Sequence, residues 1–247
     1  MKNALLLFEV LLLSCTAFSQ STSASTGSGS DDSPGRVAVG IKFSSLGGGF
    51  EVATPLTRHS NLRGGFTFFS YSRTFTKDGI TYDGQVGFRT LEAHYDFFPW
   101  AASFHVSGGL LAYLADPVTA TPAVAGQSFS LGGHTYYSDT ANPISGHGKI
   151  NVNRVAPTIT VGWGNLLPRS AKRWSIPVEV GVAFQGAPNA TLNLSGNACV
   201  FPASDCRNVA TDPMIHSQVV AEQTKINNNL SSFKVYPILS VGFGYKF

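Results

Sequence analysis

The stretch Tyr236-Pro-Ile-Leu-Ser-Val-Gly-Phe-Gly-Tyr-Lys-Phe247 decides the fold of this chain. Successive side chains of an extended strand point to opposite faces. One face of this stretch is apolar and carries Leu239, Val241, Phe243, Tyr245 and Phe247. From residue 240 on, the other face carries Ser240, Gly242, Gly244 and Lys246. This alternation predicts a β-strand with one polar side and one side that meets an apolar environment.

The amino end has the pattern of an export signal. Lys2 precedes an apolar run at residues 4–13, and small side chains follow at Ala17 and Ser19. This order predicts a signal peptide at residues 1–19. Residues 12–15 also fit a lipoprotein site, so lipidation at Cys15 remains an alternative. Residues 20–36 are rich in Ser, Thr and Gly, which predicts a flexible lead-in.

The composition is typical of a protein whose surface contacts an apolar environment as well as water. Hydrophobic residues make up 43% and charged residues only 13% of the sequence, against roughly 25% charged residues in soluble domains. Beyond the leader, no run of 18 apolar residues could form a spanning helix, so a membrane crossing would need a closed barrel. The net charge of +3 and the lack of a basic, aromatic-rich patch argue against nucleic acid as a partner.

Segments with a period of two recur between turn residues from residue 37 to the end. The eight predicted strands are residues 37–43, 50–53, 61–75, 84–98, 104–114, 149–163, 174–185 and 234–247. An even number of strands joined mostly by alternating short and long connections predicts an all-β fold, an eight-stranded antiparallel up-and-down transmembrane β-barrel over residues 37–247. We expect β-bulges near residues 89–90 and 153–154, because they keep the apolar side chains on one face.

Two longer connections interrupt this pattern, a polar loop at residues 116–147 and an excursion at residues 188–233. The excursion contains Cys199 and Cys206, which we expect to form a disulfide in an oxidising compartment. Apolar residues at helical spacing follow Asp212, a suitable N-cap, and Pro213, a suitable first residue. They predict one short helix at residues 212–230, lying either outside the barrel or in its lumen.

Short sequence stretches then indicate a family. They are Leu46-Gly-Gly-Gly-Phe-Glu51, Asn61-Leu-Arg-Gly-Gly65, Phe184-Gln-Gly186 and Tyr236-Pro-Ile-Leu-Ser240. With the closing strand, they give a chain that resembles the small bacterial outer-membrane barrels of the OmpA and OmpW type, and more closely an uncharacterised group of such barrels. The resemblance covers residues 37–247. It implies the outer membrane of a Gram-negative-type bacterium as the location.

The resemblance also implies partners and assigns roles to the aromatic residues. It implies a monomer that meets outer-membrane lipids, lipopolysaccharide, the barrel-insertion machinery and an unknown surface partner. Phe243, Tyr245 and Phe247 correspond to the signal that the insertion machinery reads. Trp100, Trp163 and Trp174 all fall where strands end at short turns, which predicts an aromatic girdle.

The inward positions of the predicted strands carry charged and titratable side chains. They are Lys42, Glu51, Arg63, Arg89, Glu92, His94, Asp96, His105, Glu179 and Lys246. Four cations balance four carboxylates, and an eight-stranded barrel is just wide enough to be filled by its own side chains. We therefore predict an ion-pair network that plugs the lumen. The alternative is a narrow polar conduit, or a proton-sensitive gate at His94 and His105.

These features predict a structural or surface-interaction role for an outer-membrane barrel, with a narrow channel or transporter for small or apolar solutes as the alternative. His105 and Ser107 are the only pair that suggests catalysis, and His with Ser at a spacing of two is a weak signal. We expect no enzyme activity, cofactor or metal. Outward apolar side chains argue against a soluble ligand carrier of the lipocalin type.

Overall fold

The computed structural model describes residues 37–77, 80–100, 103–124, 128–202 and 204–247. The expected signal peptide, the alternative lipidation at Cys15 and the lead-in at residues 20–36 lie outside this part of the chain. In the described part, no helix is both long enough and apolar enough to cross a membrane.

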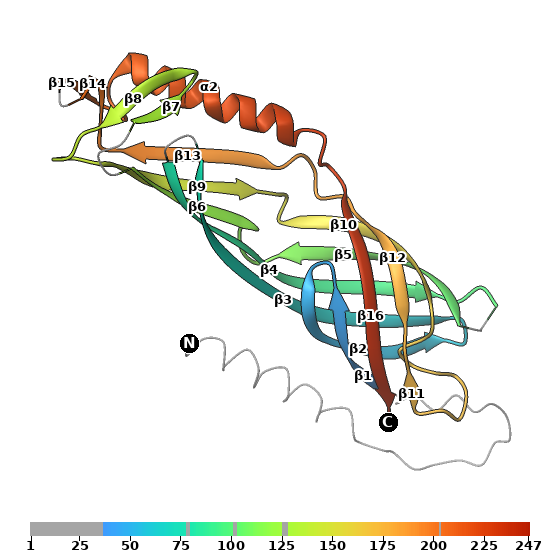
Figure 1. Ribbon diagram of the computed structural model, residues 1–247. Helices are drawn as coiled ribbons and strands as arrows, with labels where there is room; N and C mark the ends of the chain where they lie inside the picture. Colours follow the sequence, from blue (N-terminus) through green and yellow to red (C-terminus); the bar gives the residue numbers. More distant parts are fainter. Residues whose placement is uncertain (1–36, 78–79, 101–102, 125–127, 203) are drawn as a thin grey trace, which may run out of the picture. The chain divides into compact units, whose positions relative to one another are not determined.

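Eight antiparallel strands close into a barrel in which each strand pairs with both neighbours (Figure 1). They are β1 (Ala38–Ser44), β2 (Gly47–Thr57), β3 (Ser60–Lys77), β4 (Ile80–Phe97), β5 (Phe104–Tyr113), β10 (Val155–Trp163), β12 (Val178–Ala183) and β16 (Tyr236–Lys246). β1 pairs with β16 and β4 pairs with β5, which closes the circle. A two-residue strand, β11 (Trp174–Ser175), also pairs with β16. The up-and-down eight-stranded barrel predicted from the sequence is confirmed.

The outer wall of the barrel is apolar on every side. Phe43 and Phe50 leave 62% and 69% of their surface exposed. Further exposed apolar side chains along the wall are Val39, Ile41, Leu62, Leu91, Ile159, Val180, Leu239 and Val241. Soluble monomers rarely expose contiguous apolar patches of such extent, because apolar area in contact with water costs about 25 cal/mol per Å².

The two ends of the barrel differ. β1 begins and β16 ends at the same end, since Ala38 pairs with Lys246. The connections β2–β3, β4–β5 and β10–β11 turn at this end, which we call the terminal end. At the other end β3 and β4 continue as a hairpin beyond the barrel, and the two long connections are inserted there (Figure 1).

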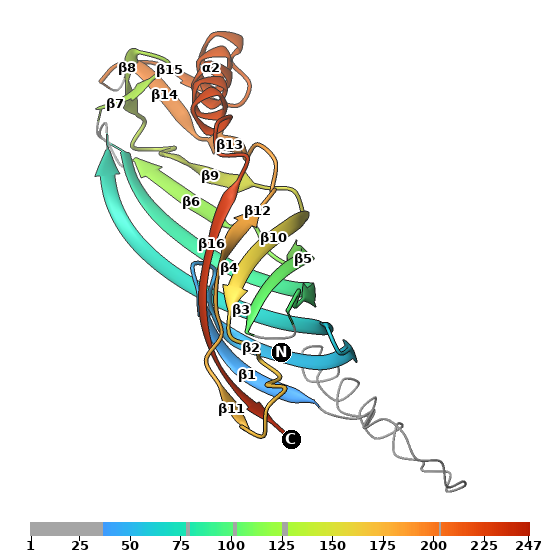
Figure 2. The same cartoon turned by 90° about the vertical axis from the view of Figure 1, so that its right-hand side faces the viewer.

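These insertions fold into a second structure that we call the head. β4 exchanges partners along its length: residues 90–97 pair with β5, whereas residues 81–86 pair with β6 (Val118–Val124). β9 (Ile144–Asn151) and β13 (Asn189–Ser195) extend this sheet. A second sheet and one helix complete the head, as Figure 2 shows: β7 (Ser128–Leu131), β8 (His134–Ser138), β14 (Asn197–Phe201), β15 (Ser204–Asn208) and α2 (Pro213–Leu230).

The head has its own hydrophobic core between the two sheets and α2. Phe129 and Ile144 are almost fully buried there, and Ile215 and Val219 are the buried residues of α2. The helix begins as the sequence predicts, because the side chain of Asp212 accepts hydrogen bonds from the first-turn amides. α2 therefore belongs to the head and packs on β13, so the lumenal position that the sequence left open is excluded.

Three predictions about the strands are wrong. The expected loop at residues 116–147 contains β6, β7, β8 and the start of β9. The excursion at residues 188–233 contains the predicted helix and, in addition, β13 to β15. The bulge expected at residues 89–90 is absent, since β3 and β4 pair in one unbroken register from Ser60↔Phe97 to Lys77↔Ile80. The predicted strand at residues 149–163 is two strands, β9 in the head and β10 in the barrel.

The outer edge of β13 is covered by amide side chains of α2. Asn227 Oδ1 accepts a hydrogen bond from the Ala190 amide at 2.7 Å, and Asn227 Nδ2 donates to the Ala190 carbonyl at 3.3 Å. Gln223 Oε1 accepts from the Leu192 amide at 3.1 Å. These side chains occupy the positions that a further strand would take, and so block pairing at this edge.

We predict that Asn227→Ala opens the β13 edge. One buried amide loses its acceptor, which costs about 1 kcal/mol and should speed hydrogen exchange of the segment 189–195 about fivefold. Asn228→Ala is the matched control, because Asn228 is exposed on the same helix and both changes raise helix propensity alike. Equal exchange in the two variants would contradict the role of Asn227.

Candidate functional site in the barrel lumen

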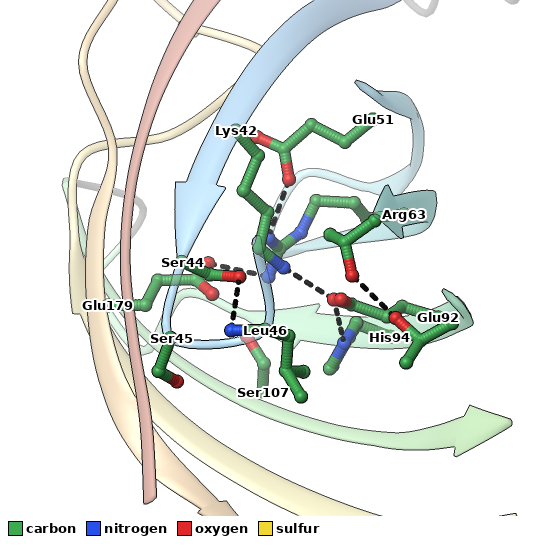
Figure 3. A network of polar contacts seen from close by, with 12 residues as sticks. Lys42, Ser44, Ser45, Leu46, Glu51, Arg63, Glu92, His94, Ser107 and Glu179 are labelled. Carbon is green, nitrogen blue, oxygen red and sulfur yellow. Dashed lines mark hydrogen bonds and ion pairs between the residues drawn. The ribbon is translucent and has the colours of Figure 1, made fainter. Parts of the chain in front are cut away.

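An ion-pair network centred on Arg63 fills the middle of the barrel (Figure 3). The guanidinium binds both oxygens of Asp96 at 3.0 Å, through Nε and Nη2. Its Nη1 lies 3.1 Å from Glu51 Oε2, and its Nη2 lies 2.5 Å from Glu179 Oε1. A single buried cation on β3 thus holds carboxylates from β2, β4 and β12. Because these partners come from separate strands, the network ties opposite walls together.

Further polar side chains extend this network, which we call the charged layer. Lys42 pairs with Glu92, and His94 Nε2 lies 3.4 Å from the same carboxylate oxygen. His105 Nε2 lies 3.0 Å from Glu179 Oε1. The Ser107 hydroxyl donates to Asp96 Oδ1 at 2.6 Å. These residues are all more than nine-tenths buried.

Glycines opposite the large side chains make room for the charged layer. Gly162 pairs with His105 on one side and with Glu179 on the other. A Cβ atom at Gly162 would lie 2.6 Å from the His105 ring and 2.8 Å from Glu179 Cγ. Gly109 stands in the same relation to His94, where a Cβ atom would lie 2.5 Å from Nδ1. Glycines at these inward positions therefore allow an eight-stranded barrel to contain long charged side chains.

Apolar side chains close the charged layer on both sides. Toward the head, buried apolar residues fill the barrel: Leu46, Leu111, Tyr113, Ala156, Ala183 and Ile238, with Phe88, Val152 and Tyr236 against them. Toward the terminal end, Leu166 and Leu167 from the β10–β11 connection pack with Ala38 and Ala53. The interior therefore has three layers, with the charges in the middle one.

Eight of the ten predicted lumen residues belong to the charged layer, and the other two lie outside this layer. Arg89 is exposed on the outer side of β4, and its guanidinium carbon lies 5.9 Å from the centre of the Phe68 ring. The predicted bulge had placed it inward. With an unbroken register, Phe88 faces inward instead and joins the apolar layer on the head side. Lys246 lies at the terminal end, where Nζ donates to the carbonyls of Pro168 and Ser170.

The charge balance of the lumen is corrected as a result. Among the described residues, the charged layer has two permanent cations, Lys42 and Arg63, and four carboxylates. The prediction of four cations against four carboxylates is wrong. His94 and His105 each contact one of these carboxylates. Glu92 Oε1, His94 Nδ1 and the hydroxyls of Thr158 and Thr160 find no hydrogen-bond partner in the described part of the chain.

His105 and Ser107 do not form a catalytic pair in this arrangement. Each is bonded to a different carboxylate, His105 to Glu179 and Ser107 to Asp96. Within the described ranges, no group of His, Cys, Asp and Glu side chains could hold a metal ion. His105 and Ser107 are thus each held by a carboxylate of the charged layer.

The aromatic residues singled out in the sequence gather at the terminal end. Trp100, Trp163 and Trp174 are 58% to 73% exposed. Trp174 contacts the rings of Phe243 and Tyr245, with centroids 5.0 and 4.6 Å apart. Phe247 packs edge-on against Tyr245. The closing strand therefore presents its aromatic side chains on the outer wall, and their role as an insertion signal stays a prediction.

The predicted disulfide is present in the head. Cys199 and Cys206 face each other across the β14–β15 hairpin and are covalently joined. Asp205, next to Cys206, adopts a positive φ of 49° in this hairpin. The bond holds a surface hairpin of the head and lies away from the charged layer.

The fold and the lumen together define a closed eight-stranded antiparallel barrel with an apolar outer wall and an ion-paired interior. Two solved structures share this fold. CarO of Acinetobacter baumannii is 22% identical, with 85% of this chain and 97% of that chain covered and a TM-score of 0.50. CarO2 of Acinetobacter baumannii is 21% identical, with 86% and 98% covered and a TM-score of 0.51. No protein-family model and no curated protein sequence matches the chain.

We predict that Arg63→Met destabilises the barrel strongly, whereas Arg89→Met does not. Loss of Arg63 leaves Glu51, Asp96 and Glu179 without their shared cation, and breaking a buried ion pair costs about 3–5 kcal/mol. An exposed position such as Arg89 contributes within about 0.5 kcal/mol. Urea unfolding of the refolded protein in detergent, followed by tryptophan fluorescence, measures both. Similar midpoints for the two variants would contradict the Arg63-centred network.

Glycine substitutions test the space for the charged layer in a matched way. Gly162→Ala inserts a methyl group between His105 and Glu179 and should cost about 1–3 kcal/mol, because overpacking displaces buried side chains. Gly108→Ala is the control on β5, since a Cβ atom there meets nothing within 4 Å. It should leave the unfolding midpoint unchanged or slightly raised. A harmless Gly162→Ala would show that the pair is loosely packed.

Proposed function

We propose that this protein is an outer-membrane β-barrel whose filled barrel anchors the head at the cell surface. The observation that carries the proposal is the combination of an apolar outer wall with a charged layer closed between two apolar layers. The barrel fold itself is shared with CarO and CarO2 of Acinetobacter baumannii. The likeness of several short stretches to OmpA- and OmpW-type barrels agrees with it.

The orientation follows from the usual topology of such barrels, in which both termini lie on the periplasmic side and long loops lie outside. In this orientation the terminal end, with its exposed tryptophans, lies at the inner interface of the membrane. The head then projects into the medium outside the cell. Lipopolysaccharide and an unknown surface partner are the partners that this placement favours.

An anchoring role accounts for the interior better than a channel does. Conduction through the barrel would need displacement of Arg63 from three carboxylates and of the apolar side chains on both sides. Leaving buried charges unpaired is costly. His105 and Ser107 lie within this closed layer and are engaged there, so we assign no enzyme activity to them.

The head is the part that we propose to interact with a partner. It has a separate hydrophobic core and a disulfide-linked hairpin. On this hairpin Phe201 is 63% exposed, and Met214 at the start of α2 is 65% exposed. Exposed apolar side chains on a braced hairpin are suited to contact with another macromolecule. We propose that the barrel acts as a monomer that carries this surface.

We predict that the refolded protein inserts into planar bilayers without producing unitary conductance steps. Its folding is checked first on a gel, where the unheated sample should migrate differently from the boiled one. Identical migration would argue against any barrel in solution. The conductance trace then tests the filled lumen, since the three layers should block ions.

Two variants distinguish a true pore from leakage around the protein. Reproducible steps in the wild type that change with Glu179→Gln, a lumen residue, and stay the same with Arg89→Met, an outer-wall residue, would show a conducting lumen. That result would overturn the anchoring proposal in favour of a narrow channel. Steps that respond to neither variant would reflect disturbance of the bilayer.

A further inference from the structure

The β10–β11 connection, residues 164–173, crosses the terminal end of the barrel and is here called the mouth loop. Leu166 and Leu167 anchor it by packing inside the barrel. Asn165 is 8% exposed, and its Oδ1 accepts hydrogen bonds from Asn61 Nδ2 and from the Leu167 amide, both at 2.9 Å. These two bonds fix the orientation of the Asn165 amide. Its Nδ2 is buried and has no acceptor among the described residues.

Arg169 of the same loop is in a similar situation. Its guanidinium carbon lies 5.0 Å from the centre of the Phe98 ring. Its Nε and Nη2 atoms are buried and meet no acceptor within the part of the chain that the structure describes. Burial lowers the pKa of Arg169, since the charged form loses hydration. The loop therefore holds a partly desolvated cation without an anionic partner.

The two groups lie over the same pair of strands. Asn165 contacts Asn61, the second residue of β3, which pairs with Asp96 of β4. Arg169 stacks on Phe98, whose amide donates to the His59 carbonyl just before β3. Asn61 and Phe98 are thus neighbours at the terminal end of the β3–β4 hairpin. The mouth loop thus places three buried nitrogen donors that have no acceptor among the described residues, one from Asn165 and two from Arg169, over this pair of neighbouring residues.

The exposed charged side chains of the loops at the terminal end are of one sign. Arg58, Lys172 and Arg173 are exposed at the terminal end. The segments at this end, residues 54–60, 98–103, 164–175 and 244–247, contain no Asp or Glu. The chain itself therefore supplies no carboxylate side chain from these segments to Arg169. A guanidinium edge and an amide N–H₂ group both supply planar N–H donors, which match the acceptors of an oxyanion.

We propose that the mouth loop binds an oxyanion, the phosphate group of a free phosphate or of a lipid headgroup, between Asn165 Nδ2 and the Nε–Nη2 edge of Arg169. The bound oxyanion supplies the acceptors that these donors lack, and the basic side chains around the mouth attract it. The site depends on the mouth loop and the terminal end alone. The phosphate-site proposal therefore does not depend on the role of the head or on whether the lumen conducts ions.

The test uses the refolded full chain in a maltoside detergent, which contains no phosphate. Inorganic phosphate and dihexanoyl phosphatidylglycerol are titrated separately at constant ionic strength, with chloride as the reference anion. Binding is followed by isothermal calorimetry and by the thermal midpoint. Saturable binding of either phosphate probe supports the site. Binding of inorganic phosphate indicates a soluble ligand, whereas binding of the lipid alone indicates a headgroup.

Variants assign the binding to the proposed donors. Arg169→Met keeps an apolar stem over Phe98 and should weaken affinity at least tenfold, while Lys172→Met, an equal loss of charge on the same loop, should change it less than twofold. If Arg169→Met fails to fold, Arg169→Lys takes its place, because lysine keeps the charge and lacks the two-pronged edge. No phosphate binding above chloride, or equal loss in the Arg169 and Lys172 variants, would overturn the proposal.

Discussion

The structure depends on one guanidinium that is shared by three carboxylates. Arg63 of β3 reaches Glu51 and Asp96 on the two neighbouring strands and Glu179 on the opposite wall of the barrel, so one side chain links four strands. An eight-stranded barrel leaves space for little more than its own side chains, and buried charges are tolerated only when they are paired and hydrogen-bonded. The narrow lumen also explains the glycines opposite His94, His105 and Glu179, because a larger residue there would occupy the space that the charged side chains fill.

Much of the barrel could be predicted because the period of two is strong wherever one face meets an apolar medium. All eight barrel strands, the inward direction of eight of the ten lumen residues and the N-cap Asp212 follow from local patterns. The predicted inward direction of Arg89 is wrong for an instructive reason. Val86 and Phe88 are apolar, so the alternation predicts that they face outward and requires a bulge before residue 91. In the structure the barrel interior is apolar at the level of Phe88. The inward face of β4 therefore changes from polar to apolar along the strand, although the register with β3 is unbroken.

The head could not be predicted for a different reason. Its strands are short, and β6 is composed of Val, Thr, Ala and Pro, residues that show little alternation. Their pairing depends on partners far away in the sequence, such as β9 with β13 and β8 with β14. The nitrogen donors of the mouth loop could not be predicted from local sequence patterns either. Asn165 and Arg169 stand in a turn, and their lack of acceptors is a property of the folded loop.

The unbroken register of β3 and β4 has a consequence for how the head is attached. Because no bulge intervenes, Phe88 in the barrel layer and Ile80 in the head core lie on the same face of one strand. β4 also exchanges β5 for β6 within a few residues, so the head sheet begins while the barrel wall still contains the same strand. A head joined by paired strands has less freedom than one joined by a flexible linker. The charged layer, the apolar layer above it and the head core are therefore successive levels along one hairpin, and a filled barrel gives that hairpin a fixed base.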